Sequence, residues 1–221
     1  MYLFNRQKPE IYRNMHIGYN IGGEINGSYH SSLGTTGLGL ELRKEFLASN
    51  NLGHRERFIT QVFLEHHFSL LENKLNISPG ISWSNFSNEG NFFYPGIDVG
   101  FEFNENHKIY GNLAKVNRIP TFTDLYYVSK TESGNPDLRP ENAVSAEIGY
   151  RFQQNNFLGK VSGFMRNSEN SIDWVKKSPT DIWKAENIGN IDTKGIEVEF
   201  GQSFNSFLKS YSVGYTFLES K

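Results

Sequence analysis

The sequence contains no cysteine. A disulfide framework and a thiolate metal site are therefore excluded, and the composition is compatible with an oxidising compartment such as the periplasm or the cell surface. No run of about 18 apolar residues occurs, so the sequence offers no transmembrane helix. The formal net charge of −2 gives no indication of a nucleic-acid partner.

Methionine is also scarce. Three methionines stand against eighteen phenylalanines, eleven tyrosines and twenty-one glycines, a composition that favours strands over helices. The mean hydropathy of −0.53 is too polar for a bundle of membrane helices, but it does not exclude a transmembrane barrel, which alternates apolar and polar residues. Residues 1–10 lack an apolar stretch of signal-peptide length, so we expect either a cytosolic protein or a segment of a longer precursor.

Apolar and polar side chains alternate with a period of two along most of the chain, which is typical of strands with one apolar face. The strands expected from this pattern cover residues 17–25, 38–42, 58–68, 75–83, 97–103, 146–152, 196–200 and 211–217. Segments 107–119 and 157–168 have β composition but no clean apolar face. About ten strands result, most of them near the roughly 9–11 residues that a tilted strand needs to cross a bilayer.

The connections between these strands are of two kinds, and the two kinds alternate. Short turns are expected near 70–73, 104–106 and 153–156, long loops at 119–141 and 169–192, and shorter loops at 48–54 and 85–92. Short turns at one end and long loops at the other are typical of a transmembrane barrel. A soluble up-and-down barrel alternates in the same way. The pattern therefore predicts an all-β, antiparallel up-and-down barrel and leaves its surroundings open.

The first long loop carries an ordered set of residues. It begins Arg118-Ile119-Pro120-Thr121-Phe122-Thr123-Asp124-Leu125-Tyr126-Tyr127 and continues Gly134-Asn135-Pro136-Asp137-Leu138-Arg139-Pro140-Glu141. Loops of this length inside regular β structure are usually functional. The set resembles the signature R-x-P-(S/T)-x-x-(D/E)-L-Y…G-N-P-x-L-(K/R)-P-E found in the barrel of TonB-dependent outer-membrane receptors. Asn187-Ile188-Gly189 and Lys194-Gly195-Ile196-Glu197 are similar to the same family's entry to a late strand.

This resemblance implies a receptor in the outer membrane of a Gram-negative bacterium that imports a scarce nutrient, such as cobalamin or a ferric siderophore, with energy supplied by TonB. Such receptors close about 22 strands around a plug. Residues 1–221 would then form a partial barrel, lacking the plug, the early strands and the final strands. The implied partners are outer-membrane lipid, the small-molecule cargo, and TonB through the missing plug; no nucleic acid is implied.

Two other functions stay open on the residues alone. One is a surface adhesion or binding β-barrel, which a plug-encoding segment upstream of this chain would exclude. The other is a soluble lipocalin-like binder, which solubility as a monomer without detergent would support. We do not expect an enzyme or a cofactor, because the sequence has no Gly-rich phosphate loop, no nucleophile elbow and no cysteine nucleophile.

The signature residues are expected to be mainly structural. Pro120, Pro136 and Pro140 would fix turn geometry, and Gly134 would supply a positive φ. The full set comprises Arg118, Pro120, Asp124, Leu125, Tyr126, Gly134, Asn135, Pro136, Leu138, Pro140, Glu141, Gly195 and Glu197.

Ligand contacts are expected from exposed aromatic and basic residues of the two long loops. The candidates are Tyr126, Tyr127, Lys130, Trp174 and Trp183. For the two tryptophans the favoured interpretation is that they pin the loop or belong to an interfacial girdle; the alternative is that they stack on an aromatic or corrin ligand. No metal site is expected from the adjacent histidines at 66 and 67, because neighbouring residues of a strand point to opposite faces.

Overall fold

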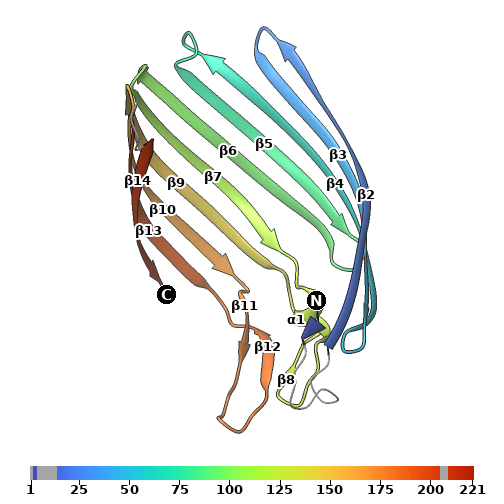
Figure 1. Cartoon of the computed structure of the whole chain (residues 1–221). Coiled ribbons are helices and arrows are strands. Elements are labelled where there is room, and N and C mark those ends of the chain that lie inside the picture. Colours follow the sequence, from blue (N-terminus) through green and yellow to red (C-terminus); the bar gives the residue numbers. More distant parts are fainter. Residues whose placement is uncertain (1, 4–13, 205–208) are drawn as a thin grey trace.

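The computed structural model describes residues 2–3, 14–204 and 209–221, and most of these residues lie in strands (Figure 1). Eleven strands form one sheet in the order β1-β2-β3-β4-β5-β6-β7-β9-β10-β13-β14. Their bounds are Tyr2–Leu3 (β1), Asn14–Ser31 (β2), Gly34–Ser49 (β3), Gly53–Leu70 (β4), Leu75–Phe86 (β5), Gly90–Asn104 (β6), His107–Arg118 (β7), Glu141–Gln154 (β9), Phe157–Glu169 (β10), Ile191–Ser203 (β13) and Ser210–Ser220 (β14). Each strand pairs with its neighbours antiparallel, which confirms the predicted up-and-down topology.

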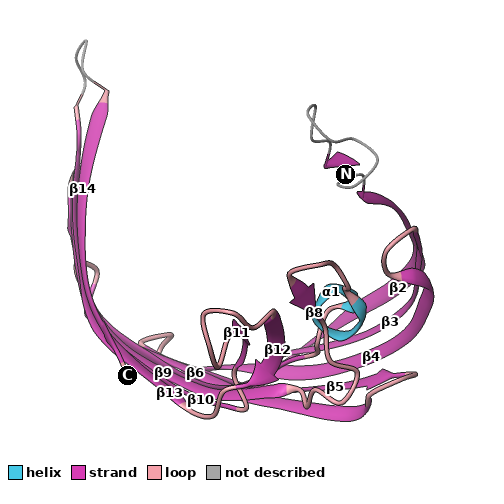
Figure 2. Ribbon diagram, turned by 90° about the horizontal axis from the view of Figure 1, so that it is seen from below, coloured by secondary structure: helices cyan, strands magenta, loops and turns pink. Residues whose placement is uncertain are grey.

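The sheet curves into an open trough, and the two long loops lie over its concave side (Figure 2). These loops contain one short helix and a separate three-stranded sheet in the order β11-β12-β8. The elements are α1 (Phe122–Tyr126), β8 (Glu132–Ser133), β11 (Ile172–Val175) and β12 (Trp183–Asn187). The sequence indicated only loops there. Within the described residues, no helix has the length and apolar character needed to cross a bilayer.

The register assigns the alternating residues to two faces, because directly opposed residues of an antiparallel pair share a face. One row across five ladders joins Phe101, Ile109, Tyr150, Val161, Val198 and Tyr215. On β4, the side chains of Arg55 and Arg57 contact aromatic rings of α1. The odd-numbered residues of β4 therefore face the concave side, and Phe58, Val62 and Leu64 face the convex side.

The convex face is apolar and has no covering layer among the described residues. Ile25 is 71% exposed, Tyr215 is 68% exposed and Ile148 is 66% exposed. A soluble protein rarely leaves a continuous apolar surface of this kind in water. Apart from β1, the strands of this sheet have from 11 residues in β14 to 18 in β2 and β4, and roughly 9–11 residues suffice to span a bilayer.

Candidate functional site

The first long loop, between β7 and β9, begins with the start of helix α1. Thr121 Oγ1 accepts a hydrogen bond from the Asp124 backbone N–H at 3.1 Å, and the Asp124 carboxylate accepts one from the Thr121 N–H at 3.1 Å. This reciprocal capping box satisfies two donors that a helix start leaves unpaired. Pro120, immediately before it, is fully buried, and Leu125 is 2% exposed. The Pro-Thr-x-x-Asp-Leu part of the signature therefore builds a fixed helix start.

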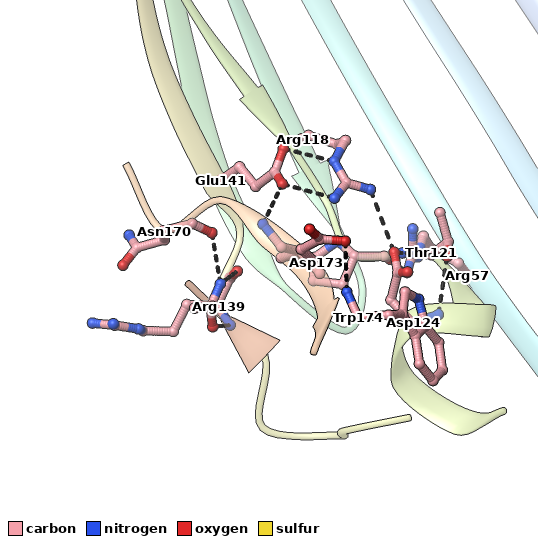
Figure 3. Close-up of polar contacts among 12 residues, drawn as sticks. Arg57, Arg118, Thr121, Asp124, Arg139, Glu141, Asn170, Asp173 and Trp174 are labelled. Atoms are coloured by element: carbon pink, nitrogen blue, oxygen red, sulfur yellow. Dashed lines mark hydrogen bonds and ion pairs between the residues drawn. The ribbon is translucent and has the colours of Figure 1, made fainter. Parts of the chain in front are cut away.

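Arg118 and Glu141 close the base of this loop. Arg118 Nε and Nη2 donate to the two carboxylate oxygens of Glu141 at 2.6 and 2.7 Å, and Arg118 Nη1 donates to Asp124 Oδ2 at 3.3 Å (Figure 3). Glu141 Oε1 also accepts from the backbone N–H of Ile172, the first residue of β11, at 2.6 Å. We call Arg118, Asp124, Glu141 and the Ile172 amide the clasp. It connects the two long loops to each other and to the sheet.

Gly134 lies directly against α1. A Cβ atom at this position would be 2.8 Å from the carbonyl oxygen of Asp124 and 2.9 Å from the backbone nitrogen of Tyr126. The prediction that Gly134 supplies a positive φ is wrong: among the described glycines, positive φ occurs at 34, 53, 90 and 189. The position requires a residue without a side chain because two backbone segments touch there. The adjacent Asn135 N–H donates to the Asp124 carbonyl oxygen at 2.9 Å.

The second long loop, between β10 and β13, is fastened to the first by Asn187. Its Nδ2 donates to the carbonyl oxygens of Arg139 at 2.9 Å and Asn170 at 2.7 Å, and its Oδ1 accepts from the Arg139 N–H at 3.0 Å. β12 also pairs in parallel with β8, joining Trp183 to Glu132 in the ladder. The two loops, 119–140 and 170–190, therefore form one folded unit, which we call the loop unit.

A small apolar core lies inside this unit. Leu125, Leu138 and Ala185 are buried together, with Ile172 and Trp174 packed against them. Pro136 and Pro140 lie on either side of Leu138 in the chain, and Leu138 is 5% exposed. The G-N-P-x-L-x-P part of the signature thus brings one leucine from the first loop into contact with the second.

Two arginines of the sheet hold α1 against the concave face. The Arg55 guanidinium lies 3.6 Å from the ring centroid of Tyr126, and that of Arg57 lies 4.8 Å from the centroid of Phe122. Arg57 also donates to the carbonyl oxygen of Pro120 at 3.1 Å. Cation–π pairs of this kind contribute more when they are desolvated, and Arg57 is only 7% exposed.

The loop unit contains a cleft of about 540 Å³. Its lining residues are Thr123, Tyr127, Glu132, Trp174 and Trp183. Tyr127 and Trp174 come from different loops and meet edge to face, with ring centroids 6.3 Å apart. The Tyr127 hydroxyl accepts a hydrogen bond from Asn14 at 3.0 Å, which fixes the ring from the side of β2.

The cleft carries one carboxylate and one nearby ammonium group. Glu132 accepts hydrogen bonds from the hydroxyls of Ser129 and Thr131. These bonds, Ser129 first, lower the pKa of Glu132, so the group stays ionised at neutral pH. Lys176 Nζ lies 5.0 Å from the ring centroid of Trp183. The site can therefore stack flat groups on three aromatic rings and can pair with donors through Glu132.

The structure brings three of the five predicted ligand candidates together. Tyr127, Trp174 and Trp183 line the cleft. Tyr126 lies beneath the Arg55 guanidinium instead, and Lys130 is exposed and does not belong to the lining. Thr123 and Glu132 were missed, because nothing in the sequence indicates that β8 pairs with β12.

Two signature residues, Gly195 and Glu197, lie on β13 away from the cleft. Gly195 is covered by the ring of Phe164, whose Cζ would be 2.5 Å from an added Cβ. Glu197 is opposite Ser162 and Thr216 in the ladders. Both residues are on the same face as Glu147 and Glu199, which is the concave one by register.

The described residues include no group of three or more histidine, aspartate or glutamate side chains arranged to hold a metal ion. His66 Nδ1 is hydrogen-bonded to Thr36 Oγ1, and His67 Nδ1 to Ser78 Oγ. The adjacent histidines thus contact hydroxyls on different neighbouring strands.

The sequence of this curved sheet with its loop unit matches the family model described as "TonB dependent receptor-like, beta-barrel" over residues 5–221. The chain belongs to this family of TonB-dependent receptors. Members of the family are outer-membrane proteins of Gram-negative bacteria that act as transporters or receptors. The match confirms the resemblance to TonB-dependent receptors seen in the sequence, and the sheet confirms the predicted all-β, antiparallel fold class.

The names of the relatives refer to two kinds of cargo, vitamin B12 and iron siderophores. The vitamin B12 transporter BtuB of Vibrio vulnificus (strain YJ016) is 39% identical over 82 residues, which is 37% of this chain and 13% of BtuB. The ferrienterobactin receptor of Escherichia coli (strain K12) is 22% identical over 160 residues, covering 63% of this chain and 21% of that receptor. The crystal structure of the siderophore receptor PirA from Pseudomonas aeruginosa superimposes with a TM-score of 0.80 at 19% identity, covering 94% of this chain and 41% of PirA. The chain thus spans less than half the length of each of these TonB-dependent receptors.

Proposed function

We propose that this chain forms part of the wall and the cargo-binding mouth of an outer-membrane receptor that imports a scarce nutrient. Cobalamin and ferric siderophores are the leading candidate cargoes, because relatives of both kinds align with the chain. The rest of the barrel, of about 22 strands, and a plug would come from elsewhere in the receptor. TonB would act through that plug to energise import.

The convex face of the sheet supports contact with outer-membrane lipid. Its apolar rows run across neighbouring strands, as the register of Phe101, Ile109 and Tyr150 illustrates, and none of the described residues forms a layer over them. The opposite, concave face carries carboxylates such as Glu147 and Glu199. An apolar outside and a polar inside are the arrangement of a transmembrane barrel.

The observation that carries the proposal is the aromatic cleft over the concave side. Tyr127, Trp174 and Trp183 give it three rings, and aromatic rings supply large contact areas at low conformational cost. The loop unit that holds them is fastened by the clasp and by Asn187. Cargo would therefore meet a cleft that is already folded, which reduces the ordering cost of binding.

The test is uptake by whole cells that produce the intact receptor. Replacing Trp174 and Trp183 together by alanine should raise the half-saturating cargo concentration by about tenfold or more, because two stacking surfaces are lost. Radiolabelled cyanocobalamin and ferric enterobactin are the probes, and a strain without TonB sets the background. Trp83→Ala is the matched control, since Trp83 lies on the convex face opposite Val62 and Phe93.

Uptake of either probe that depends on TonB and falls in the double variant, but not in Trp83→Ala, supports the proposal. Unchanged uptake in the double variant would assign the two tryptophans a purely structural role. Uptake of neither probe by the unsubstituted receptor would remove cobalamin and enterobactin from the candidate cargoes.

A further inference from the structure

Glu141 occupies an unusual place in the loop unit, because its carboxylate serves two separate segments. Both oxygens accept hydrogen bonds from Arg118, at 2.6 and 2.7 Å. The oxygen Oε1 also accepts from the Ile172 amide, at 2.6 Å. Charge-assisted bonds of this length are the strong class of hydrogen bond. Glu141 itself does not line the cleft.

The hydrogen bonds of Glu141 connect it with the two segments that carry Tyr127 and Trp174, which lie on different sides of the cleft. In one direction, Arg118 reaches Asp124 Oδ2 at 3.3 Å, and Asp124 caps α1, which ends one residue before Tyr127. In the other direction, the Ile172 amide begins β11, two residues before Trp174 (Figure 3). One carboxylate therefore joins the segments that carry the two rings meeting edge to face.

We propose that Glu141 is a positioning residue that sets Trp174 of the second loop against Tyr127 of the first. The proposal rests on the proposed function in treating this pair as a cargo-binding wall. Among the described residues, the other hydrogen bonds between the two loops reach β12 and not β11: Asn187 bonds to Arg139, and the Trp183 N–H donates to the Thr131 carbonyl oxygen at 2.8 Å. The remaining contacts of β11 with the first loop are the apolar ones of Ile172 and Trp174 in the small core and the ring contact of Trp174 with Tyr127. Glu141 is the acceptor that holds the start of β11 to the base of the first loop.

The first test measures the surroundings of the Trp174 ring by fluorine NMR and needs no cargo. The intact receptor is labelled with 5-fluorotryptophan, and the fluorine resonances of Trp174, Trp183 and Trp83 are assigned by single phenylalanine substitutions. In Glu141→Ala the resonance of Trp174 should shift and broaden, because the start of β11 loses its acceptor, whereas that of Trp83 on the convex face should stay in place.

Two further variants separate positioning from a general loss of charge or fold. Glu141→Gln keeps an oxygen for the Ile172 amide and should shift the Trp174 resonance less than Glu141→Ala. Glu102→Ala is the matched control, since Glu102 pairs with Lys108 at 3.2 Å on β6 and β7, away from the cleft; it should move none of the three resonances. An unchanged Trp174 resonance in Glu141→Ala, or an equal change at Trp83, overturns the proposal.

The second test measures equilibrium binding of cyanocobalamin and ferric enterobactin to the purified intact receptor. Glu141→Ala should raise the dissociation constant of the probe that binds by about tenfold, within the range of coupling energies between neighbouring residues. In a receptor that already carries Trp174→Ala, the further change Glu141→Ala should leave the dissociation constant as it is. Additive losses would show that Glu141 does not act through Trp174. Binding of neither probe would count against the proposed cargoes alone, because the fluorine measurement still decides the positioning role.

Discussion

At the scale of single residues, the first long loop contains residues that stabilise the loop structure and other residues that line the cleft. Arg118, Asp124 and Glu141 bond to one another, and Leu138 enters the small core. None of these four side chains lines the cleft. The rings that do line it, such as Tyr127, lie beside the signature or outside it.

Gly134 gives the most direct test at this scale. Replacing it by alanine should destabilise the loop unit by about 1–3 kcal/mol, the usual cost of an overpacked site, because the new Cβ would meet backbone atoms of Asp124 and Tyr126 at 2.8 and 2.9 Å. Limited proteolysis of the folded intact receptor measures the effect as faster cleavage within 119–140. Gly23→Ala is the control, since nothing lies within 4 Å of a Cβ there. Equal cleavage rates in the Gly134 variant and the parent would contradict this account.

Residue-level reasoning from the sequence named all three rings of the cleft, Tyr127, Trp174 and Trp183, as ligand candidates. Their contact with cargo and the turn-fixing role of the prolines stay predictions. The same reasoning gave Gly134 the wrong physical role, because a sequence does not distinguish a glycine needed for positive φ from one needed for close approach. Glu132 could not be found at all, since its place depends on β8 meeting β12 about fifty residues away.

At the scale of elements, alternation predicted the long strands well because one face of each is apolar. The faces of β7 and β10 were obscured by glycines: Gly111 and Gly163 occupy convex positions on either side of Ile148. The strands also extend beyond their apolar centres, so β2 runs from Asn14 to Ser31 where alternation indicated 17–25. The elements α1, β8, β11 and β12 were not predicted, because each has only two to five residues, too few to show a period. β8 in addition depends on pairing with β12 of the other loop.

The two faces of the strands predict opposite responses to substitution. Ile148→Arg or Val198→Arg should destabilise the intact barrel by roughly 2–4 kcal/mol, because each places a charge on the convex face near the middle of its strand. Glu147→Ala and Glu199→Ala, which change the adjacent concave positions, should cost little. Reversible unfolding of the receptor in lipid vesicles measures all four. Similar costs on both faces would contradict the assignment of the convex face to lipid.

At the scale of the whole molecule, the connections divide between the two ends of the trough. Connections 32–33, 71–74, 105–106 and 155–156 are short and lie at one end, whereas 119–140 and 170–190 leave the other end together with 50–52 and 87–89. The loop unit therefore occupies one opening of the curved wall (Figure 1). In the proposed receptor this opening faces the outside of the cell, where cargo arrives.

The central claim, that the cleft binds cargo at the outer surface, is tested most directly by thiol labelling of whole cells. Thr123→Cys places a thiol in the cleft lining, and Asn156→Cys places one in a turn at the opposite end; this chain has no other cysteine. With the intact receptor, a membrane-impermeant maleimide should label position 123 and not 156, and saturating cyanocobalamin or ferric enterobactin should slow labelling at 123. Labelling of position 156 but not 123 would contradict the orientation, and labelling of 123 at a rate unaffected by either bound cargo would contradict the cleft.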